Sequence, residues 1–276
     1  MKVLTIGDLH GLSCWKQVCF GDYNNYKRWE DGLVSDESGA PFLYTEYDYI
    51  VFVGDYVDSF EESNVSILHN LKEIIKFQKS NPPRIILLAG NHDICYMFPQ
   101  GMFRASGYRS EMYHDLSALF ETGHFQAAFQ LGNCLWTHAG LTTGCLHSMK
   151  TVVERSDYRF KELVPQDGTL AELINFHFDS LLPELFNVSM SRGGTWFPRE
   201  AGIFWADRKD LLNCHVENLN QVVGHTHKWA LEEVVKETCT LYFVDAIGKT
   251  RSEFLVLEFD ESLKIISKEF LIVNII

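Results

Sequence analysis

Five short apolar runs, each ending abruptly in a polar motif, limit the fold of this chain more than any other feature. The runs are rich in Val, Ile and Leu and comprise Lys2–Ile6, Tyr49–Val53, Ile85–Ala89, Leu135–Thr137 and Gln221–Val223. Short, almost wholly apolar runs are typical of strands that are buried on both faces of a sheet. Polar residues that follow such strands meet at one edge of the sheet, where open α/β sheets bind their ligands. We therefore expect an α/β fold with a polar site at one sheet edge.

Three segments between these runs have the spacing of amphipathic helices. Ser63 is positioned to cap a helix that reaches about Lys79, and a shorter helix is expected over Ser110–Glu121. Asp167 is positioned to cap a third helix, which Pro183 should end. These helices would cover the faces of the predicted sheet.

Three further runs follow residue 227, and two long segments lack a regular pattern. The runs alternate or are continuously apolar, so we expect them to form strands of a second sheet: Thr240–Val244, Phe254–Phe259 and Lys268–Ile275. The segments at about 21–47 and 144–205 mix charges without periodicity. We expect them to be insertions over the polar edge of a single domain spanning residues 1–276.

The charge balance argues against several functions. The 276 residues include 24 Lys and Arg against 37 Asp and Glu, a net charge of −13, whereas binding to nucleic-acid phosphates depends on basic residues. No apolar run reaches the roughly 18 residues that a membrane helix needs. Asp8 interrupts the apolar start too early for a signal peptide. We therefore expect a cytoplasmic protein with no membrane partner and no stable nucleic-acid partner, and leave its oligomeric state open.

The polar motifs contain the donor atoms of a metal site. In chain order they are GDLHG at 7–11, GDYVD at 54–58, GNHD at 90–93, THAGL at 137–141 and GHTH at 224–227. Carboxylates, an amide and imidazoles together suit divalent transition metals such as Mn, Fe or Zn better than Ca or Mg, which prefer oxygen ligands alone. The donors outnumber the four ligands of one tetrahedral zinc. The sequence therefore predicts two divalent metal ions.

The order of these motifs resembles that of the calcineurin-like metallophosphoesterase superfamily. GDLHG, GDYVD and the GIFW element at 202–205 are most similar to its bacterial-type phosphoprotein-phosphatase branch. The resemblance extends from residue 3 to about residue 260. It implies a four-layer α/β/β/α sandwich with two mixed sheets, holding a dinuclear metal centre at one end.

The resemblance also implies roles for individual residues. Those that match metal ligands of the family are Asp8, His10, Asp55, Asn91, His138, His225 and His227. Asp8, His10 and His227 would belong to the first metal. Asp55 would bridge both metals, and the remaining three would bind the second. The alternative for each is an ordinary strand-end turn residue or a buried, hydrogen-bonded histidine.

Two more residues match the catalytic pair of the family. His92 resembles the histidine that protonates the leaving group, and Asp58 resembles the carboxylate that orients it. The implied reaction is attack on phosphorus by a hydroxide that bridges the two metals. Asp93, next to His92, is expected to close the turn instead.

One motif departs from the phosphoprotein-phosphatase pattern. There, GDxVD is normally followed by Arg-Gly, and the arginine holds the substrate phosphate, whereas this chain has Ser59-Phe60. The candidates for a replacement are Arg208, Arg192 and Arg199. A bidentate guanidinium matches a phosphoryl group well.

These features predict a dinuclear-metal-dependent phosphoester hydrolase. The missing arginine favours a phosphomonoesterase of small molecules, or a hydrolase of nucleotides or dinucleoside polyphosphates. A Ser/Thr phosphoprotein phosphatase is the alternative enzyme. A non-catalytic scaffold of the same fold is disfavoured because all seven ligand positions are filled. A structural zinc protein is disfavoured because the donors include Asp and Asn and are spread from residue 8 to residue 227.

Overall fold

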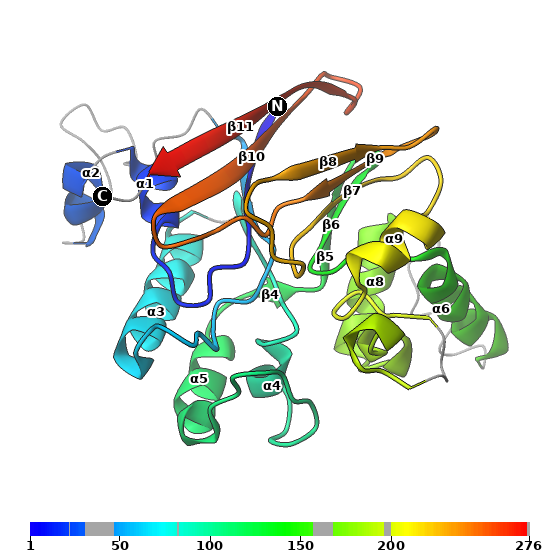
Figure 1. Cartoon of the computed structure of the whole chain (residues 1–276), viewed down its shortest axis with the longest axis horizontal. Coiled ribbons are helices and arrows are strands. Elements are labelled where there is room, and N and C mark those ends of the chain that lie inside the picture. The colour runs from blue at the N-terminus through cyan, green and yellow to red at the C-terminus, as the bar shows by residue number, and fades with distance from the viewer. Residues whose placement is uncertain (22, 31–46, 82, 157–167, 196–199, 275–276) are drawn as a thin grey trace.

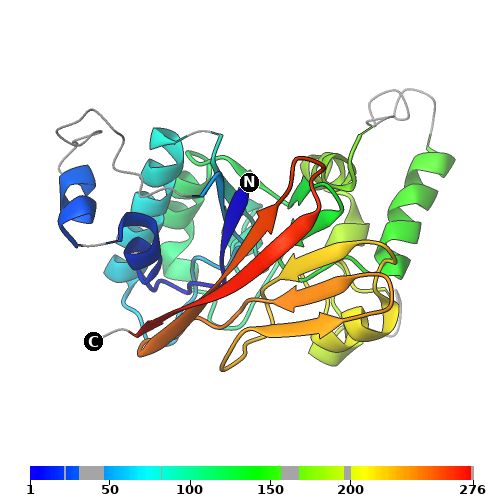
Figure 2. The ribbon, with the colours of Figure 1, turned by 90° about the horizontal axis from the view of Figure 1, so that it is seen from above.

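In the computed structural model, two mixed β-sheets lie between two layers of helices (Figure 1, Figure 2). The structure describes residues 1–21, 23–30, 47–81, 83–156, 168–195 and 200–274. The arrangement confirms the α/β/β/α sandwich that the motif order implied. Among the described residues, no helix is long and apolar enough to cross a membrane.

The first sheet contains the strands that carry three of the motifs. Its order is β11 (Ile265–Asn274), β10 (Arg251–Phe259), β1 (Lys2–Ile6), β2 (Tyr49–Phe52), β3 (Ile85–Leu88) and β4 (Phe125–Gln126). Strands β1 to β4 are parallel, whereas β10 is antiparallel to both β1 and β11. The expectation that residues 254–259 and 268–275 belong to a second sheet is therefore wrong. Their apolar pattern indicates a strand but does not specify its partner, and β10 pairs with β1 at the far end of the chain.

The second sheet carries the other two motifs. Its order is β5 (Ala128–Leu131), β6 (Cys134–Thr137), β7 (Asn220–Val223), β9 (Thr240–Phe243) and β8 (Glu232–Val235). The three central strands are parallel, and both edge strands are antiparallel to their neighbours. The predicted strand at 240–244 does lie in this sheet.

Helices form the two outer layers. Over the first sheet lie α1 (Trp15–Phe20), α2 (Tyr23–Glu30), α3 (Asn64–Ser80), α4 (Ile94–Met97) and α5 (Tyr113–Phe120), with a 3-10 turn, η1, at Ser110–Met112. Beside the second sheet lie α6 (Thr143–Arg155), α8 (Leu170–Asp179) and α9 (Arg208–Cys214), with 3-10 turns η2 (Pro183–Phe186) and η3 (Met190–Arg192).

Capping residues explain where two predicted helices begin. Ser63 accepts a hydrogen bond from the Ser66 backbone N–H, as its position before α3 predicts. Helix α8 begins after Thr169, whose side chain and Glu172 form a reciprocal capping box. Asp167, the expected cap, lies outside the described residues.

The two segments predicted to be irregular insertions are only partly described. Residues 23–30 form helix α2, so that part of the first segment is regular, and residues 31–46 lie outside the described residues. The second segment contains α6 and α8, and its residues 157–167 and 196–199 also lie outside them.

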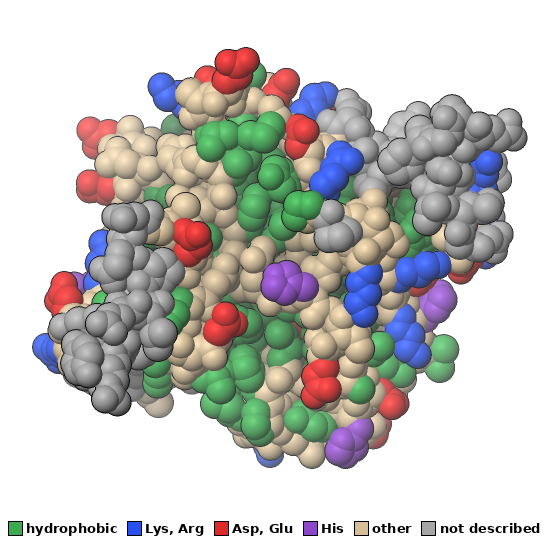
Figure 3. All heavy atoms as spheres, turned by 180° about the vertical axis from the view of Figure 1, so that it is seen from behind, with side chains coloured by type: hydrophobic (Ala, Val, Ile, Leu, Met, Phe, Trp, Pro, Cys, Tyr) green, Lys and Arg blue, Asp and Glu red, His purple; other side chains and the backbone are tan. Residues whose placement is uncertain are grey.

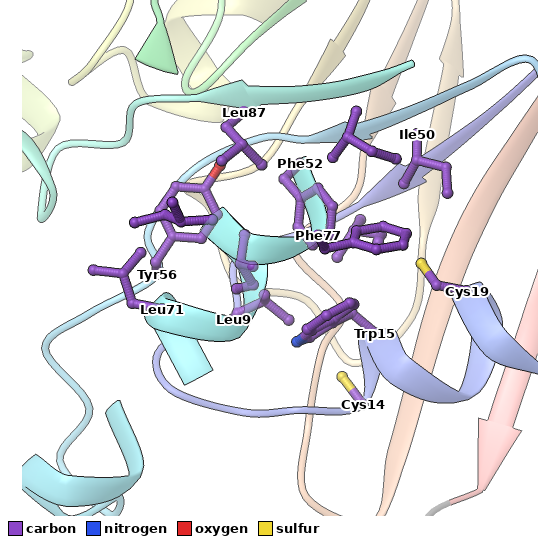
Figure 4. Close-up of a cluster of buried hydrophobic side chains, with 14 of the residues drawn as sticks. Leu9, Cys14, Trp15, Cys19, Ile50, Phe52, Tyr56, Leu71, Phe77 and Leu87 are labelled. Atoms are coloured by element: carbon purple, nitrogen blue, oxygen red, sulfur yellow. The ribbon is translucent and has the colours of Figure 1, made fainter. Parts of the chain in front are cut away.

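Aromatic packing joins the first helical layer to its sheet. Trp15 of α1 lies against Phe52 of β2 and Phe77 of α3, with ring centroids 5.8 and 5.3 Å apart (Figure 4). The indole N–H of Trp15 donates to Asn70 Oδ1 at 2.9 Å, so its polar atom is satisfied.

A second apolar cluster lies between the two sheets. Trp136 of β6 is fully buried in it, and its indole N–H donates to Thr5 Oγ1 of β1 at 2.9 Å. This bond joins two strands that are each followed by one of the polar motifs. On the face of the molecule in Figure 3, most of the Lys and Arg side chains lie in the right half of the view, whereas the acidic side chains are spread over the face.

Candidate active site

The polar motifs follow β1, β2, β3, β6 and β7, and their side chains come together where these strands end. Four motif residues have positive φ angles that non-glycine residues rarely adopt: His10 (44°), Asp55 (52°), Asp58 (61°) and His225 (64°). Such conformations are costly and gather at functional sites. The strand ends therefore hold these side chains in place at the expense of local backbone energy.

Three donor side chains meet deep in the site, and we call Asn91, His138 and His225 the inner cluster. Asn91 Oδ1 lies 2.9 Å from His138 Nε2 and 2.8 Å from His225 Nδ1. These two nitrogens are 3.2 Å apart. The Nδ1–H of His138 donates to the Val53 carbonyl at 2.9 Å, which leaves a lone pair on Nε2. These three atoms share one proton at most, so hydrogen bonds among them cannot satisfy them all. A bound cation would satisfy the acceptors that remain.

Burial keeps the two inner histidines in the neutral form that binds metals. Burial lowers the pKa of His138. It also lowers the pKa of His225 well below its usual value, and nearby His138 and Arg192 lower it further. His225 Nε2 is buried and has no hydrogen-bond partner.

We call Asp8, His10 and His227 the outer cluster, and they lie on the cavity side of the site. Asp8 Oδ2 accepts the His225 backbone N–H at 2.7 Å, but its Oδ1 is buried without a partner. Burial, Asp245 and Asp55 raise the pKa of Asp8 well above its usual value. A bound cation would relieve that unfavourable charge. The Nδ1–H of His10 donates to the Val57 carbonyl at 2.9 Å, so its Nε2 faces the site.

Asp55 lies between the two clusters. Its Oδ2 is 3.5 Å from His138 Nε2 and 3.8 Å from His10 Nε2. It is the shared member of two groups whose ligand atoms all lie within 4.8 Å of one another, one with His138 and His225 and one with His10 and His92. Burial raises the pKa of Asp55, but the surrounding histidines outweigh burial and lower it.

Neighbouring glycines make this approach possible. A Cβ added to Gly90 would lie 2.2 Å from Asp55 Oδ1, and one added to Gly224 would lie 2.0 Å from Asp8 Oδ1. Both distances are shorter than any real contact. The glycines of GNHD and GHTH therefore leave room for the two carboxylates.

His92 and Asp58 are in contact, as the resemblance implied for the catalytic pair. His92 Nδ1 lies 3.2 Å from Asp58 Oδ2, and the Tyr96 hydroxyl donates to the other Asp58 oxygen. Burial lowers the pKa of His92, but Asp55 and Asp58 outweigh it and raise the pKa to about 9.

Asp93 closes the turn, as expected. Its carboxylate accepts the backbone N–H groups of Asp55, Tyr56 and Gly90 at 2.7, 3.0 and 2.8 Å. It therefore joins the second motif to the third and does not face the clusters as a ligand.

Asp245 is a site residue that the sequence analysis missed. It is buried two residues after the end of β9, and its Oδ1 lies 3.4 Å from His227 Nδ1. The side chain of His227 is 60% exposed, and Asp245 forms an ion pair with it in the site. Strand β9 is apolar and its extension ends in Val244-Asp245, the same signal that marked the other strand ends. No recognisable motif surrounds this aspartate.

Comparison with known proteins agrees with this geometry. A model of the calcineurin-like phosphoesterase family matches residues 1–229. This chain belongs to that family. No curated protein matches the sequence.

Solved structures match nearly the whole length of this chain. A cold-active protein-tyrosine phosphatase of the psychrophile Shewanella sp. is 17% identical, with a TM-score of 0.51 over 98% of this chain and 80% of that one. A putative diadenosine tetraphosphatase is 14% identical, with a TM-score of 0.38 over 99% and 93% of the two chains. A metallophosphoesterase from Sphaerobacter thermophilus is 12% identical, with a TM-score of 0.38 over 100% and 89%. At 17% identity, the likeness to the Shewanella structure concerns the fold alone.

As a calcineurin-like phosphoesterase, the protein is a phosphoester hydrolase, and its family typically depends on two metal ions. A cavity of about 630 Å³ opens onto the site. The outer cluster, Asp58, His92 and Asp245 line it, together with the Ser59–Glu61 segment and Lys249.

Two of the three candidate phosphate-binding arginines, Arg192 and Arg208, lie away from this cavity. Arg208 pairs with Glu232, its Nε 2.8 Å from the carboxylate, and lies over the Phe243 ring. Arg192 is closer to the clusters, because it donates to Thr226 Oγ1 at 2.7 Å and to the His225 carbonyl at 3.4 Å. Arg199 lies outside the described residues. Neither Arg192 nor Arg208 is among the residues that line the cavity.

Proposed function

We propose that this enzyme hydrolyses small phosphomonoesters or nucleotides, including dinucleoside polyphosphates, at a site for two divalent transition metals. One observation carries the proposal: Asp55 Oδ2 lies close to an imidazole nitrogen of each cluster, 3.5 Å from His138 Nε2 and 3.8 Å from His10 Nε2. The inner cluster would hold one metal and the outer cluster the other, with Asp55 between them. Manganese, iron and zinc all suit this mixture of imidazole and oxygen donors.

Side chains of the protein supply the proton for the leaving group and hold the proton donor in its orientation. When bound, the metals would neutralise charge on the phosphoryl group and activate the attacking water. Asp58 accepts the Nδ1 proton of His92, which turns Nε2 towards the cavity. From there, His92 would donate a proton to the leaving oxygen. Tyr96 holds Asp58 through its second oxygen, so the imidazole keeps its direction during the transfer.

The charges of the cavity support a small substrate over a phosphoprotein. Ser59 stands where an arginine would hold the phosphate, and its hydroxyl accepts the backbone N–H groups of Glu61 and Glu62. Among the described residues that line the cavity, Lys249 is the one lysine or arginine, and it is paired with Glu61 and Glu62. A phosphopeptide would therefore gain little from side-chain cations here.

A substrate panel tests the proposal. The protein is stripped of metal and reloaded with Mn, Fe or Zn, and kcat/KM is measured for phosphomonoesters, phosphodiesters, dinucleoside polyphosphates and phosphopeptides. We expect activity only after reloading and the highest kcat/KM with a small phosphoester or nucleotide. A phosphopeptide with the highest kcat/KM would support the alternative, a Ser/Thr phosphoprotein phosphatase. Failure to bind metal or to hydrolyse any substrate would support a non-catalytic scaffold.

A pair of variants tests the role of residue 59. Ser59→Ala removes the loop hydrogen bonds without adding charge, and Ser59→Arg removes them and adds a cation. We expect Ser59→Arg to raise kcat/KM for a phosphopeptide relative to a nucleotide, compared with Ser59→Ala. An unchanged ratio would show that a missing cation does not set the substrate preference.

A further inference from the structure

Phe60 is a large apolar side chain held at the mouth of the candidate active site. The residue is 81% exposed, yet it lines the same cavity as His10 and His92. Single exposed hydrophobic residues are common and need no explanation on their own. The contacts around Phe60, however, indicate that its exposed side chain has a function.

The loop that carries Phe60 is held from three sides. Within it, the Ser59 hydroxyl accepts two backbone N–H groups at 3.1 and 2.9 Å. From one neighbouring segment, the Arg109 guanidinium donates to the carbonyls of Ser59 and Glu62. From another, Lys249 pairs with Glu61 and Glu62 at 3.2 and 3.1 Å. These bonds fix the backbone on both sides of Phe60 while its ring stays in solvent.

Gly107 lies beside the edge of the phenyl ring. A Cβ at Gly107 would lie 3.3 Å from Phe60 Cζ, and the φ of this glycine is +76°. The backbone therefore comes close to the ring edge, and most of the ring surface remains open to the cavity.

Phe60 lines the same cavity as both members of the catalytic pair. Phe60 follows Asp58 by two residues, a span of at most about 7 Å along the chain, and Asp58 contacts His92. Leu12 and Ile247 also line this cavity. Its volume of about 630 Å³ lies in the range that accommodates a small organic ligand, well beyond a phosphate alone.

We propose that Phe60 is a stacking platform for a flat aromatic group on the leaving side of the substrate. This inference rests on the proposed phosphoesterase function, because the phosphoryl group would lie at the Asp55 clusters. Aromatic rings prefer offset stacking or edge contacts with centroids 4.5–7 Å apart, and an exposed ring on a fixed loop offers both. Phe60 is thus a specificity-determining residue. An aryl phosphoester and a nucleotide share the required chemistry.

Matched substrates separate flatness from size and leaving-group basicity. Benzyl phosphate and cyclohexylmethyl phosphate both release primary alcohols of similar size and basicity, but benzyl phosphate alone is flat. With the metal-loaded enzyme, we expect KM for benzyl phosphate to be about 2- to 10-fold lower, the usual gain from an aromatic pair. Phe60→Ala should abolish this difference and leave kcat within about twofold, whereas Phe60→Trp should keep it.

A control variant excludes a general surface effect. Val65 on α3 is 77% exposed and does not line the cavity, so Val65→Ala should leave all KM values unchanged. Equal KM values for benzyl phosphate and cyclohexylmethyl phosphate with the wild-type enzyme would overturn the proposal. So would a Phe60→Ala variant whose KM rises equally for benzyl, cyclohexylmethyl and methyl phosphate, because that result would indicate a disturbed loop.

A second pair distinguishes the two sources of the aromatic group. AMP carries a base that ribose 5-phosphate lacks. An AMP advantage that Phe60→Ala removes identifies a nucleobase, and an advantage for benzyl phosphate alone identifies an aryl ester. Absence of both advantages overturns the proposal.

The failure of this inference differs from the failure of the proposed function. Benzylphosphonate cannot be hydrolysed, and its binding to the metal-loaded protein is measured by calorimetry. If benzylphosphonate binds more weakly to Phe60→Ala than to the wild type, but neither protein hydrolyses any ester, the result would support the stacking role of Phe60 and contradict the proposed phosphoesterase function. Hydrolysis of methyl phosphate with no preference for aromatic substrates would contradict the stacking role of Phe60 and support the proposed phosphoesterase function.

Discussion

The inner and outer clusters use similar donors but differ in their access to solvent. His138 is fully buried and Asn91 nearly so, and neither of them lines the cavity. The side chains of His10 and His227 are 35% and 60% exposed and line it. The inner donors are already within 3.2 Å of one another. If the proposed metals bind at these clusters, the inner metal position is built into the fold. The outer metal position would face the substrate and lose its metal first.

The largest effect should come from the residue shared by both positions. Asp55→Asn removes the one carboxylate that lies between the clusters, so we expect both metals to bind at least about 100-fold more weakly, the upper end for residues that only orient ligands. Metal content per chain after dialysis measures this. Loss at one position alone would show that Asp55 belongs to a single cluster.

His92 contacts Asp58 but belongs to neither cluster in this account. His92→Ala should lower kcat by about 10²–10⁴-fold for an alkyl phosphate, whose leaving group needs a proton. The loss should be much smaller for nitrophenyl phosphate, and the metal content should stay unchanged. Equal losses on both substrates, or a lost metal, would assign His92 to positioning or to metal binding.

Asp245 allows the outer position to be weakened alone. Asp245→Asn keeps the shape of the side chain but weakens its interaction with His227. We therefore expect the metal affinity of the outer position to fall about 10-fold. In a titration with manganese, the affinity of the tighter site, which we assign to the inner position, should stay unchanged. Asp115→Asn, at an exposed aspartate of α5, is the matched control. A change in both classes, or in neither, would remove Asp245 from the outer position.

His177 of α8 is a reference for the buried histidines of the inner cluster. It is fully buried, and neither ring nitrogen has a hydrogen-bond partner. Burial lowers its pKa to about 4, below the roughly 6.5 of an unfolded histidine. The unfolded chain therefore binds the proton first, and stability is lost as the pH falls from about 6.5 to about 4.

The size of this effect follows from the two pKa values. Between pH 7 and pH 5, metal-free wild type should lose about 2 kcal/mol more unfolding free energy than His177→Leu does. Urea unfolding at the two pH values measures the difference. Parallel losses in both proteins would mean that His177 titrates normally.

Some parts of this structure follow from local pattern and others depend on contacts between distant segments. The rule that polar residues follow buried strands located Asp8, Asp55 and His138, because each strand and its polar residue are adjacent in sequence. It would also have found Asp245, which was overlooked because no familiar motif surrounds it. Arg109 left no local signal, since its partners are carbonyls 47 and 50 residues away.

Sheet membership was beyond local pattern for the same reason. The apolar residues of β10 indicated a buried strand, but its pairing with β1 joins residues more than 240 positions apart, such as Thr5 and Leu255. The partner of a strand depends on the whole topology. The exposure of Phe60 likewise depends on Arg109 and Lys249, which hold its loop from other parts of the chain.

The central claim is that Asp55 lies between two metal positions, and electron paramagnetic resonance of manganese-loaded protein tests it most directly. With two Mn²⁺ ions per chain, we predict a spectrum of magnetically coupled ions, because one carboxylate joins them. With one Mn²⁺ per chain, the spectrum should be that of an isolated ion at the inner position. Two bound ions without coupling, or one ion at saturation, would contradict the account.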